Sequence, residues 1–199
     1  MTTAVLLAGG RSRRSGRRHK ACRRLPGERR SWLDRQIDVL RAAGADRIVL
    51  VLGHRPRRVF ACLHRRITAV RNPHPAHGSF SSLLYGLSAA RGDVLVVPVD
   101  TPLPPAVELR RMLRTRHGSD AVVPMGHDGR GGHPVLLSQR FARNLTQLDP
   151  RNPEARLDVQ LRNLAPERRR HLRLAVRSTR LNLNTGQAWR RYLQAAQDR

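Results

Sequence analysis

A glycine turn followed by basic residues is the first part of this chain that could do chemistry. Gly9 and Gly10 end an apolar run, and Arg14 and Lys20 follow them at short spacing. The exposed N–H groups of such a turn can form a cradle for anions. Lys20 is the only lysine among 39 lysine and arginine residues, and a compact ammonium group does not interchange with a planar arginine fork. The segment predicts a phosphate-binding loop; the alternative is that one lysine survived there by chance.

This loop differs from two common phosphate-binding fingerprints. Gly16 is followed by Arg17, whereas a Walker A loop needs Lys and then Ser or Thr at that point. The G-x-G-x-x-G spacing of dinucleotide-binding folds is absent as well. The segment is therefore neither a P-loop nor a dinucleotide-binding loop.

Asp100 is a lone acid at the end of the apolar run Asp93–Val99. A carboxylate there is costly unless it faces solvent, a partner or a cation. Active sites of parallel sheets lie beyond the carboxyl ends of the strands. The sequence therefore predicts that Asp100 binds Mg²⁺, which prefers carboxylate and phosphate oxygen. The alternative is structural: Asp100 or Thr101 could cap the helix that follows Pro102.

A third candidate, Asn182-Leu183-Asn184-Thr185, precedes the last expected helix. Alternation along an extended segment would place both asparagines on one face. Their amide oxygens could then bind a hard metal ion or ribose hydroxyls. Thr185 could cap the final helix, and taken alone the segment also fits an ordinary capping turn.

The elements that must position these residues are short apolar runs that alternate with amphipathic segments. The expected strands are Thr3–Ala8, Arg47–Leu52, Ile67–Val70, Asp93–Val99, Asp120–Pro124, His133–Leu137 and His171–Arg177. The expected helices are Ser31–Ala43, Arg57–Leu63, Ser79–Ala90, Pro105–His117, Ser138–Leu148, Pro153–Leu164 and Gln187–Gln197. This alternation predicts an α/β fold with a mostly parallel central sheet. The length of 199 residues fits a single domain over residues 1–199.

Composition narrows the class of partner. The net charge is +25, but the arginines are scattered and no aromatic residue interleaves with a basic run. A dedicated nucleic-acid binder concentrates its charge and offers aromatic stacking, so we expect only non-specific binding of nucleic acid. No apolar run approaches the roughly 20 residues of a membrane span, and the N-terminus lacks a secretory pattern. A cytoplasmic protein with no membrane partner is expected.

Cys22 and Cys62 are the two cysteines of the chain. Two cysteines do not make a disulfide framework or a metal site. Cys22 follows Lys20 by two residues in an electropositive stretch, where a thiol can become reactive. We expect ordinary reduced thiols.

Motifs along nearly the whole chain resemble those of the MobA-like nucleotidyltransferases, which include the molybdenum cofactor guanylyl- and cytidylyltransferases. The segment from Leu7 to Lys20 is similar to their opening L-A-G-G-x-x-x-R-M-G-x-x-x-K. Asp100-Thr101-Pro102 is similar to the D-T-P that follows a central strand, and Asn182–Thr185 is similar to N-x-N-T before the last helix. Further matches are Asn72-Pro73, Gly78–Leu83 and Gly132–Val135. The order and spacing of these motifs make the joint match specific.

This resemblance implies a three-layer Rossmann-like nucleotidyltransferase fold, of the nucleotide-diphospho-sugar transferase type. It implies Mg²⁺-dependent transfer of a nucleoside monophosphate from an NTP to a phosphorylated acceptor such as molybdopterin, with release of pyrophosphate. The implied catalytic residues are Arg14, Lys20 and Asp100. The implied nucleotide-binding residues are Leu7, Ala8, Gly9, Gly10, Arg14, Lys20, Asn72, Ser81, Ser82 and Asp100. Asp100 and Asn184 would bind the metal, and His133 and Asn182 the acceptor, in a monomer or weak oligomer.

Some residues depart from the family pattern. Ser15 replaces a methionine, Gly186-Gln187 replaces Pro-Glu, and His19 stands where an acidic residue is common in the guanylyl branch. Leu-Ala-Gly-Gly and Asn-Leu-Asn-Thr resemble the guanylyl branch, whereas the segments at Gly78–Ser82 and Gly132–Val135 look more like the cytidylyl branch. We expect GTP as the substrate, with CTP as the alternative. His133 could equally be a histidine that merely begins a strand.

Three other functions compete with this interpretation. A polyanion-binding protein could have kept the scaffold and lost catalysis. A nucleotidyltransferase could act on a sugar phosphate or another phosphorylated metabolite. A glycosyltransferase would want an acidic pair such as D-x-D after the central strand, which Asp100-Thr101-Pro102 lacks.

Overall fold

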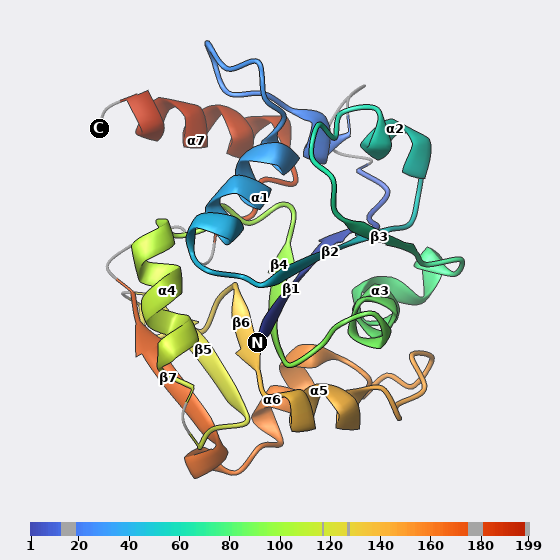
Figure 1. Cartoon of the computed structure of the whole chain (residues 1–199), viewed down its shortest axis with the longest axis vertical. Helices are drawn as coiled ribbons and strands as arrows, with labels where there is room; N and C mark the ends of the chain where they lie inside the picture. Colours follow the sequence, from blue (N-terminus) through green and yellow to red (C-terminus); the bar gives the residue numbers. More distant parts are fainter. Residues whose placement is uncertain (13–18, 117, 127, 175–180, 198–199) are drawn as a thin grey trace.

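A mixed sheet forms the centre of the computed structural model, which describes residues 1–12, 19–116, 118–126, 128–174 and 181–197 (Figure 1). Its strands, in chain order, are β1 (Thr2–Ala8), β2 (Arg47–Leu52), β3 (Thr68–Arg71), β4 (Asp93–Pro98), β5 (Ala121–Met125), β6 (Val135–Leu137) and β7 (Arg169–Arg173). They are arranged in the spatial order β3-β2-β1-β4-β6-β5-β7. The switch from β2-β1 to β4 places the carboxyl ends of β1 and β4 side by side.

Most neighbouring strands are parallel, as the sequence predicts. β1 pairs in parallel with β2 and β4, β2 with β3, and β5 with β7. β6 runs antiparallel to both β4 and β5. The expected mostly parallel α/β fold is therefore confirmed, with β6 as the reversed strand.

Helices cover both faces of the sheet and give the expected three layers (Figure 1). One face packs against α1 (Trp32–Ala42), α4 (Ala106–Arg114) and α7 (Gly186–Gln197). The other packs against α3 (Gly78–Ser88), α5 (Gln139–Leu145) and α6 (Leu157–Arg162), and a short α2 (Pro56–Phe60) follows β2. No helix in the described part of the chain is long and apolar enough to cross a membrane.

Local sequence signals set several helix ends. The Ser31 hydroxyl accepts a hydrogen bond from the Asp34 amide and caps α1, and Gly44 adopts a φ of 94° after it, where a side chain would be strained. Thr185 Oγ1 accepts from the Ala188 amide at 3.0 Å in the first turn of α7. The expected helix Pro153–Leu164 is shorter in the structure because residues 150–154 form turns and a bend, and Arg156 is extended, before α6 begins at Leu157.

The expectation of reduced cysteines is wrong. Cys22 and Cys62 form a disulfide, with their Cα atoms 5.3 Å apart. The bond joins the 3-10 turn η2 (Lys20–Cys22) to the segment after α2. The two cysteines are separated by 40 positions in the sequence, which gave no sign of this proximity, because it arises only when α2 folds back against η2.

Gly86 on α3 is a sensitive test of how this helix packs on the sheet. A Cβ at this position would overlap Val5 Cγ1 and lie 3.0 Å from Val51 Cγ2. Gly86→Ala should therefore lower the free energy of unfolding by about 1–3 kcal/mol in urea denaturation, as overpacked cores do. Gly186→Ala on α7 is the matched control, because its nearest neighbour would be Arg190 Nη1 at 3.7 Å. Equal stability of both variants would contradict this packing.

Candidate active site

Three side chains from distant parts of the sequence meet at one point. Lys20 Nζ lies 2.9 Å from Asp100 Oδ2 and 2.9 Å from Asn184 Oδ1. The Lys20 and Asp100 side chains are only 13% and 12% exposed. Their partial burial strengthens the attraction between ammonium and carboxylate relative to an exposed pair. The structure thus brings together the lysine, the acid and one of the asparagines that the sequence singled out.

The sheet explains why these residues meet. Lys20 follows the loop after β1, and Asp100 lies two residues beyond β4, the strand next to β1. Asn184 comes from the segment before α7, and this segment is tied to Asp100 because the Leu183 amide donates to the Asp100 carbonyl at 2.8 Å. Strand order therefore joins the first two residues, and a backbone hydrogen bond adds the third.

The glycine turn after β1 is packed too tightly for side chains. A Cβ on Gly9 would lie 2.9 Å from Ser82 Oγ, and a Cβ on Gly53 would lie 2.8 Å from Gly9 Cα. The Gly9 carbonyl also accepts from the His54 amide at 3.1 Å. Gly10 lies beside the lysine: its Cβ would be 3.6 Å from Lys20 Nζ. The loops after β1 and β2 therefore pack backbone to backbone at the edge of the site.

His19 joins the glycine turn to the lysine turn, a role the sequence analysis missed. Its Nδ1 accepts from the Ala21 amide at 3.3 Å, and its Nε2 lies 3.3 Å from the Gly10 carbonyl. This geometry fits a neutral ring with its proton on Nε2. Burial lowers the pKa of His19, and the charge on Lys20 acts in the same direction. The neutral imidazole therefore holds Gly10 and Lys20 in register.

The polar residues near β3 and α3 hold one another. The Asn72 amide donates to Ser81 Oγ and Ser82 Oγ, both at 3.0 Å, and Asn72 Oδ1 accepts from the His74 amide. Asn72 and Ser81 are almost fully buried, whereas Ser82 lines the cleft described next. Asn72 thus holds Ser82 in place, and neither Asn72 nor Ser81 lines that cleft.

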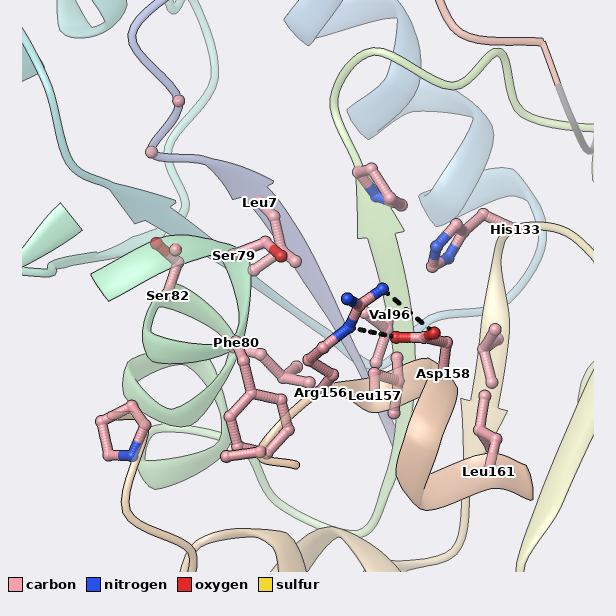
Figure 2. A pocket seen from close by; sticks show the side chains of 18 of the residues that line it. Leu7, Ser79, Phe80, Ser82, Val96, His133, Arg156, Leu157, Asp158 and Leu161 are labelled. Atoms are coloured by element: carbon pink, nitrogen blue, oxygen red, sulfur yellow. Dashed lines mark hydrogen bonds and ion pairs between the residues drawn. The ribbon is translucent and has the colours of Figure 1, made fainter. Parts of the chain in front are cut away.

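A cleft of about 1280 Å³ runs from the glycine turn across the sheet to β7. Figure 2 shows Leu7, Phe80, His133 and Arg156 around this cavity. Gly9, Gly10, Lys20 and Asp100 line the same cleft on the Leu7 side. Apolar residues on the strands form the floor, so a ring system could lie between the charged groups at the two ends.

His133 lines this cleft in a half-buried position. Burial lowers its pKa, opposed by the nearby charge of Asp100 and by a hydrogen bond with the Val96 backbone. His133 Nδ1 is buried and has no hydrogen-bond partner in the described residues. A buried nitrogen without a partner is unfavourable, so His133 is suited to meet a ligand atom after a small movement.

Basic residues at the far end of the cleft were not singled out from the sequence. Arg156 contacts Asp158 at 3.0 Å, as Figure 2 shows, and Arg162 contacts the same carboxylate at 3.1 Å. Arg169 and His171 of β7 line the same end. Since the arginines outnumber the carboxylate, this end suits an anionic ligand. No local motif distinguishes these arginines from the many others in the sequence.

The chemistry of the Lys20 site fits a divalent metal ion. Carboxylate and amide oxygens from Asp100 and Asn184 already surround a cation, the Lys20 ammonium, at 2.9 Å each. Mg²⁺ is commonly held by one or two protein oxygens together with phosphate oxygens and water. No group of three or more His, Cys, Asp or Glu residues suited to a metal occurs in the described residues, so the protein supplies only part of such a coordination shell.

Two more expected site residues, Asn182 and Ala8, lie away from the cleft. Asn182 is exposed, and its Oδ1 accepts from the Asn184 amide at 3.0 Å. The two asparagines therefore do not share one extended face. Ala8 is fully buried under the glycine turn, and Arg14 lies outside the described residues.

The low pKa of His19 predicts a pH-dependent stability. The pKa of His19 in the folded protein lies below the usual 6.5, so the neutral ring makes its full contribution to folding stability above pH 6.5. That contribution is lost as the pH falls toward the folded pKa, because the unfolded chain binds the proton first. Burial lowers the pKa of His133 as well. Urea denaturation should show lower stability at pH 5.5 than at pH 7.5. Carboxylates such as Asp149, with a pKa of about 2, respond only at lower pH.

His19→Gln is the informative variant for this prediction. Glutamine can accept from Ala21 and donate to Gly10 without titrating. Its stability should fall less between pH 7.5 and 5.5 than that of the wild type, with the remaining fall due to His133. An unchanged pH dependence in His19→Gln would rule out His19 as a source.

Comparisons with known proteins identify the family of this chain. A model of the MobA-like NTP transferase domain matches residues 4–166. The molybdenum cofactor guanylyltransferase of Shewanella baltica (strain OS155) is 30% identical over 139 residues, which cover 67% of this chain and 66% of that protein. The chain thus spans slightly less than two thirds of this curated relative. Asn184 lies beyond the region matched by the family model.

Solved structures share the fold over almost the full length. Rv0371c from Mycobacterium tuberculosis H37Rv has a TM-score of 0.79 at 25% identity, with 98% of both chains covered; a manganese complex of that protein gives a TM-score of 0.73 at 24% identity, with the same coverage. A nucleotidyl transferase from Methanothermobacter thermautotroptrophicus has a TM-score of 0.80 at 23% identity, covering 100% of this chain and 98% of that one. By the extent of the family match, this chain belongs to the family of MobA-like NTP transferase domains.

Proposed function

We propose that this protein is a Mg²⁺-dependent nucleotidyltransferase that transfers a nucleoside monophosphate from an NTP to a phosphorylated acceptor. The observation that carries the proposal is that Lys20 and Asp100 line a large cleft and meet there, with Asn184 bound to the same ammonium. An ammonium, a carboxylate and an amide oxygen beside a glycine turn are suited to hold a triphosphate with its metal ion. Membership of the MobA-like family supports the same reaction class.

In this reaction a phosphate oxygen of the acceptor attacks the α-phosphorus of the NTP. The bond from the α-phosphorus to the oxygen that bridges to the β-phosphorus breaks, and pyrophosphate leaves with the negative charge. Lys20 would neutralise that charge, and Gly9 and Gly10 let the backbone approach the nucleotide. Asp100 and Asn184 would hold Mg²⁺, which supplies further charge neutralisation when bound. We assign Arg14 the same phosphate role as Lys20 from its spacing in the sequence.

The two ends of the cleft suggest where each substrate lies. We propose that Leu7, Ala8, Gly9, Gly10 and Ser82 surround the nucleotide, with Asn72 and Ser81 acting through Ser82. The acceptor would lie toward His133 and the basic end. His133 is a better candidate for acceptor contact than Asn182, whose side chain is turned onto its own loop.

GTP is the proposed nucleotide and molybdopterin the proposed acceptor. The curated relative from Shewanella baltica is named a molybdenum cofactor guanylyltransferase, which favours GTP over CTP. We further propose that residues 1–199 act as one nucleotidyltransferase domain, as a monomer or weak oligomer, because Asn184 near the C-terminal helix completes the Lys20 site. A cytoplasmic location stays a prediction, and the Cys22–Cys62 disulfide is unusual for that compartment.

The first test measures ligand binding and product. Thermal shift with Mg·GTP, Mg·CTP, Mg·ATP and Mg·UTP should give the largest stabilisation with GTP. A pyrophosphate-release assay with molybdopterin should then show turnover, and sugar phosphates serve as competing acceptors. A larger thermal shift with Mg·CTP than with Mg·GTP would identify CTP as the substrate in place of GTP. If no NTP stabilises the protein and RNA binds with a steep salt dependence, the polyanion-binding alternative holds.

The second test removes the central charges. Lys20→Ala and Asp100→Ala should each lower turnover by at least ~100-fold, because phosphate and metal electrostatics dominate such reactions. Asp38→Ala is the matched control, since Asp38 forms ion pairs with Arg30 and Arg65 away from the cleft. Pyrophosphate release within a few-fold of wild type in either site variant would remove that residue from the mechanism.

A further inference from the structure

The residue of interest is Gln36, a buried amide on α1 behind the Asp100 loop. Gln36 is 2% exposed, and its Nε2 donates to the Thr101 carbonyl at 2.9 Å and to the Val99 carbonyl at 3.4 Å. These two carbonyls belong to the residues on either side of Asp100. The side chain of Gln36 therefore reaches the backbone immediately before and after the acid.

A second donor from α1 completes this support. The Trp32 indole Nε1 donates to the Val99 carbonyl at 2.7 Å. The Asp100 carbonyl in turn accepts from the Leu183 amide at 2.8 Å. Three consecutive carbonyls, those of Val99, Asp100 and Thr101, are thus fixed from two sides, and the direction of the Asp100 side chain follows from them.

Contacts around Trp32 also extend to the segment that carries Asn184. Arg23 Nη1 donates to the Leu183 carbonyl at 3.3 Å, and its guanidinium lies 5.2 Å from the centre of the Trp189 ring. Trp189 packs edge-on against Trp32 at 5.3 Å. Asp100 and Asn184 therefore each adjoin a residue held by these contacts, and the Arg23 amide also donates to the Lys20 carbonyl at 3.4 Å.

Burying the Gln36 amide costs desolvation free energy, which indicates that its Nε2 donor has a role that an apolar side chain could not fill. Its Oε1 is buried and has no hydrogen-bond partner in the described residues, which is unfavourable by the desolvation of a polar atom. A methionine would fill nearly the same volume without that cost. Because a carbonyl can only accept, the amide nitrogen must face Val99 and Thr101, and the orphan oxygen is the consequence.

We propose that Gln36 is a positioning residue that aims the Asp100 carboxylate at Lys20 Nζ, the donor that Asp100 shares with Asn184 Oδ1. This inference rests on the proposed function, because the direction of the Asp100 carboxylate affects turnover only if Asp100 acts in the proposed reaction. Gln36 lies behind the backbone and does not line the cleft, so it acts through Asp100 and not on substrate. Misplacing a reacting group by about 1 Å can cost roughly 100-fold in rate.

The test compares Gln36→Met with Ile37→Val. Gln36→Met keeps the length of the side chain and removes the donor, whereas Ile37→Val loosens the packing of the same helix and keeps the donor. Three quantities are measured on the full chain: hydrogen–deuterium exchange of peptides covering residues 98–102 and 181–185, the dissociation constant of Mn·GTP, and pyrophosphate release.

In Gln36→Met, both peptides should exchange faster, Mn·GTP should bind at least about 5-fold more weakly, and kcat should fall roughly 10- to 100-fold. The KM for the acceptor should stay within about 2-fold, because its end of the cleft is untouched. Ile37→Val should leave exchange in these peptides, Mn·GTP binding and kcat near wild type. This pattern supports positioning by Gln36.

Three results would overturn the inference: unchanged exchange in Gln36→Met, faster exchange without any change in Mn·GTP binding, or equal losses in Ile37→Val. Failure of the proposed function would look different, since the wild type itself would release no pyrophosphate. Exchange in the peptides covering residues 98–102 and 181–185 would then still decide whether Gln36 holds the Asp100 loop.

Discussion

The attraction between the Lys20 ammonium and the Asp100 carboxylate is the interaction on which this site depends. Both side chains are nearly seven-eighths removed from solvent, with 13% and 12% exposed. Removing two charges from water costs desolvation free energy. The ion pair offsets that cost only when its geometry is good and the remaining hydrogen-bonding groups of both side chains have partners. Asn184 provides one such further bond to the ammonium. The surrounding backbone must therefore be held firmly, and most of the unusual contacts near the site serve that need.

Two kinds of support meet at the pair. On the Lys20 side, close backbone packing of Gly9 against Gly53 and the neutral ring of His19 fix the loop after β1. On the Asp100 side, buried polar groups of α1 and the Leu183 amide hold the loop after β4. Close backbone contact at the glycines fixes the loop that carries Lys20, and side-chain hydrogen bonds fix the loop that carries Asp100. The ion pair is thus a property of the sheet edge as a whole.

The sequence predicted the parts of this protein that have local signatures. Capping at Ser31, the glycine stop at Gly44 and the apolar run of β4 are visible over a few residues, so most elements and the mostly parallel sheet followed from them. The meeting of Lys20 with Asp100 followed from the rule that active sites lie beyond the carboxyl ends of parallel strands. The family motifs added Asn184.

Contacts that depend on the full fold could not be predicted in this way. Nothing near Cys22 or Cys62 shows that α2 returns to η2, and the polarity of Gln36 within an apolar helix face has no local meaning until Val99 and Thr101 lie behind it. Asn182 was misplaced because alternation assumes an extended chain, while its side chain bonds to the next turn of its own loop. Each of these depends on a neighbour that the sequence does not identify.

The position of Asn184 along the chain also has a consequence for synthesis. A ribosome delivers Lys20 early, Asp100 midway and Asn184 last, since translation is vectorial. Until the segment with Leu183 and Asn184 emerges, the ammonium lacks its amide partner and the Asp100 carbonyl lacks its donor. A nascent polypeptide therefore cannot assemble this centre, and a chain released too early would carry the glycine turn without the means to complete it.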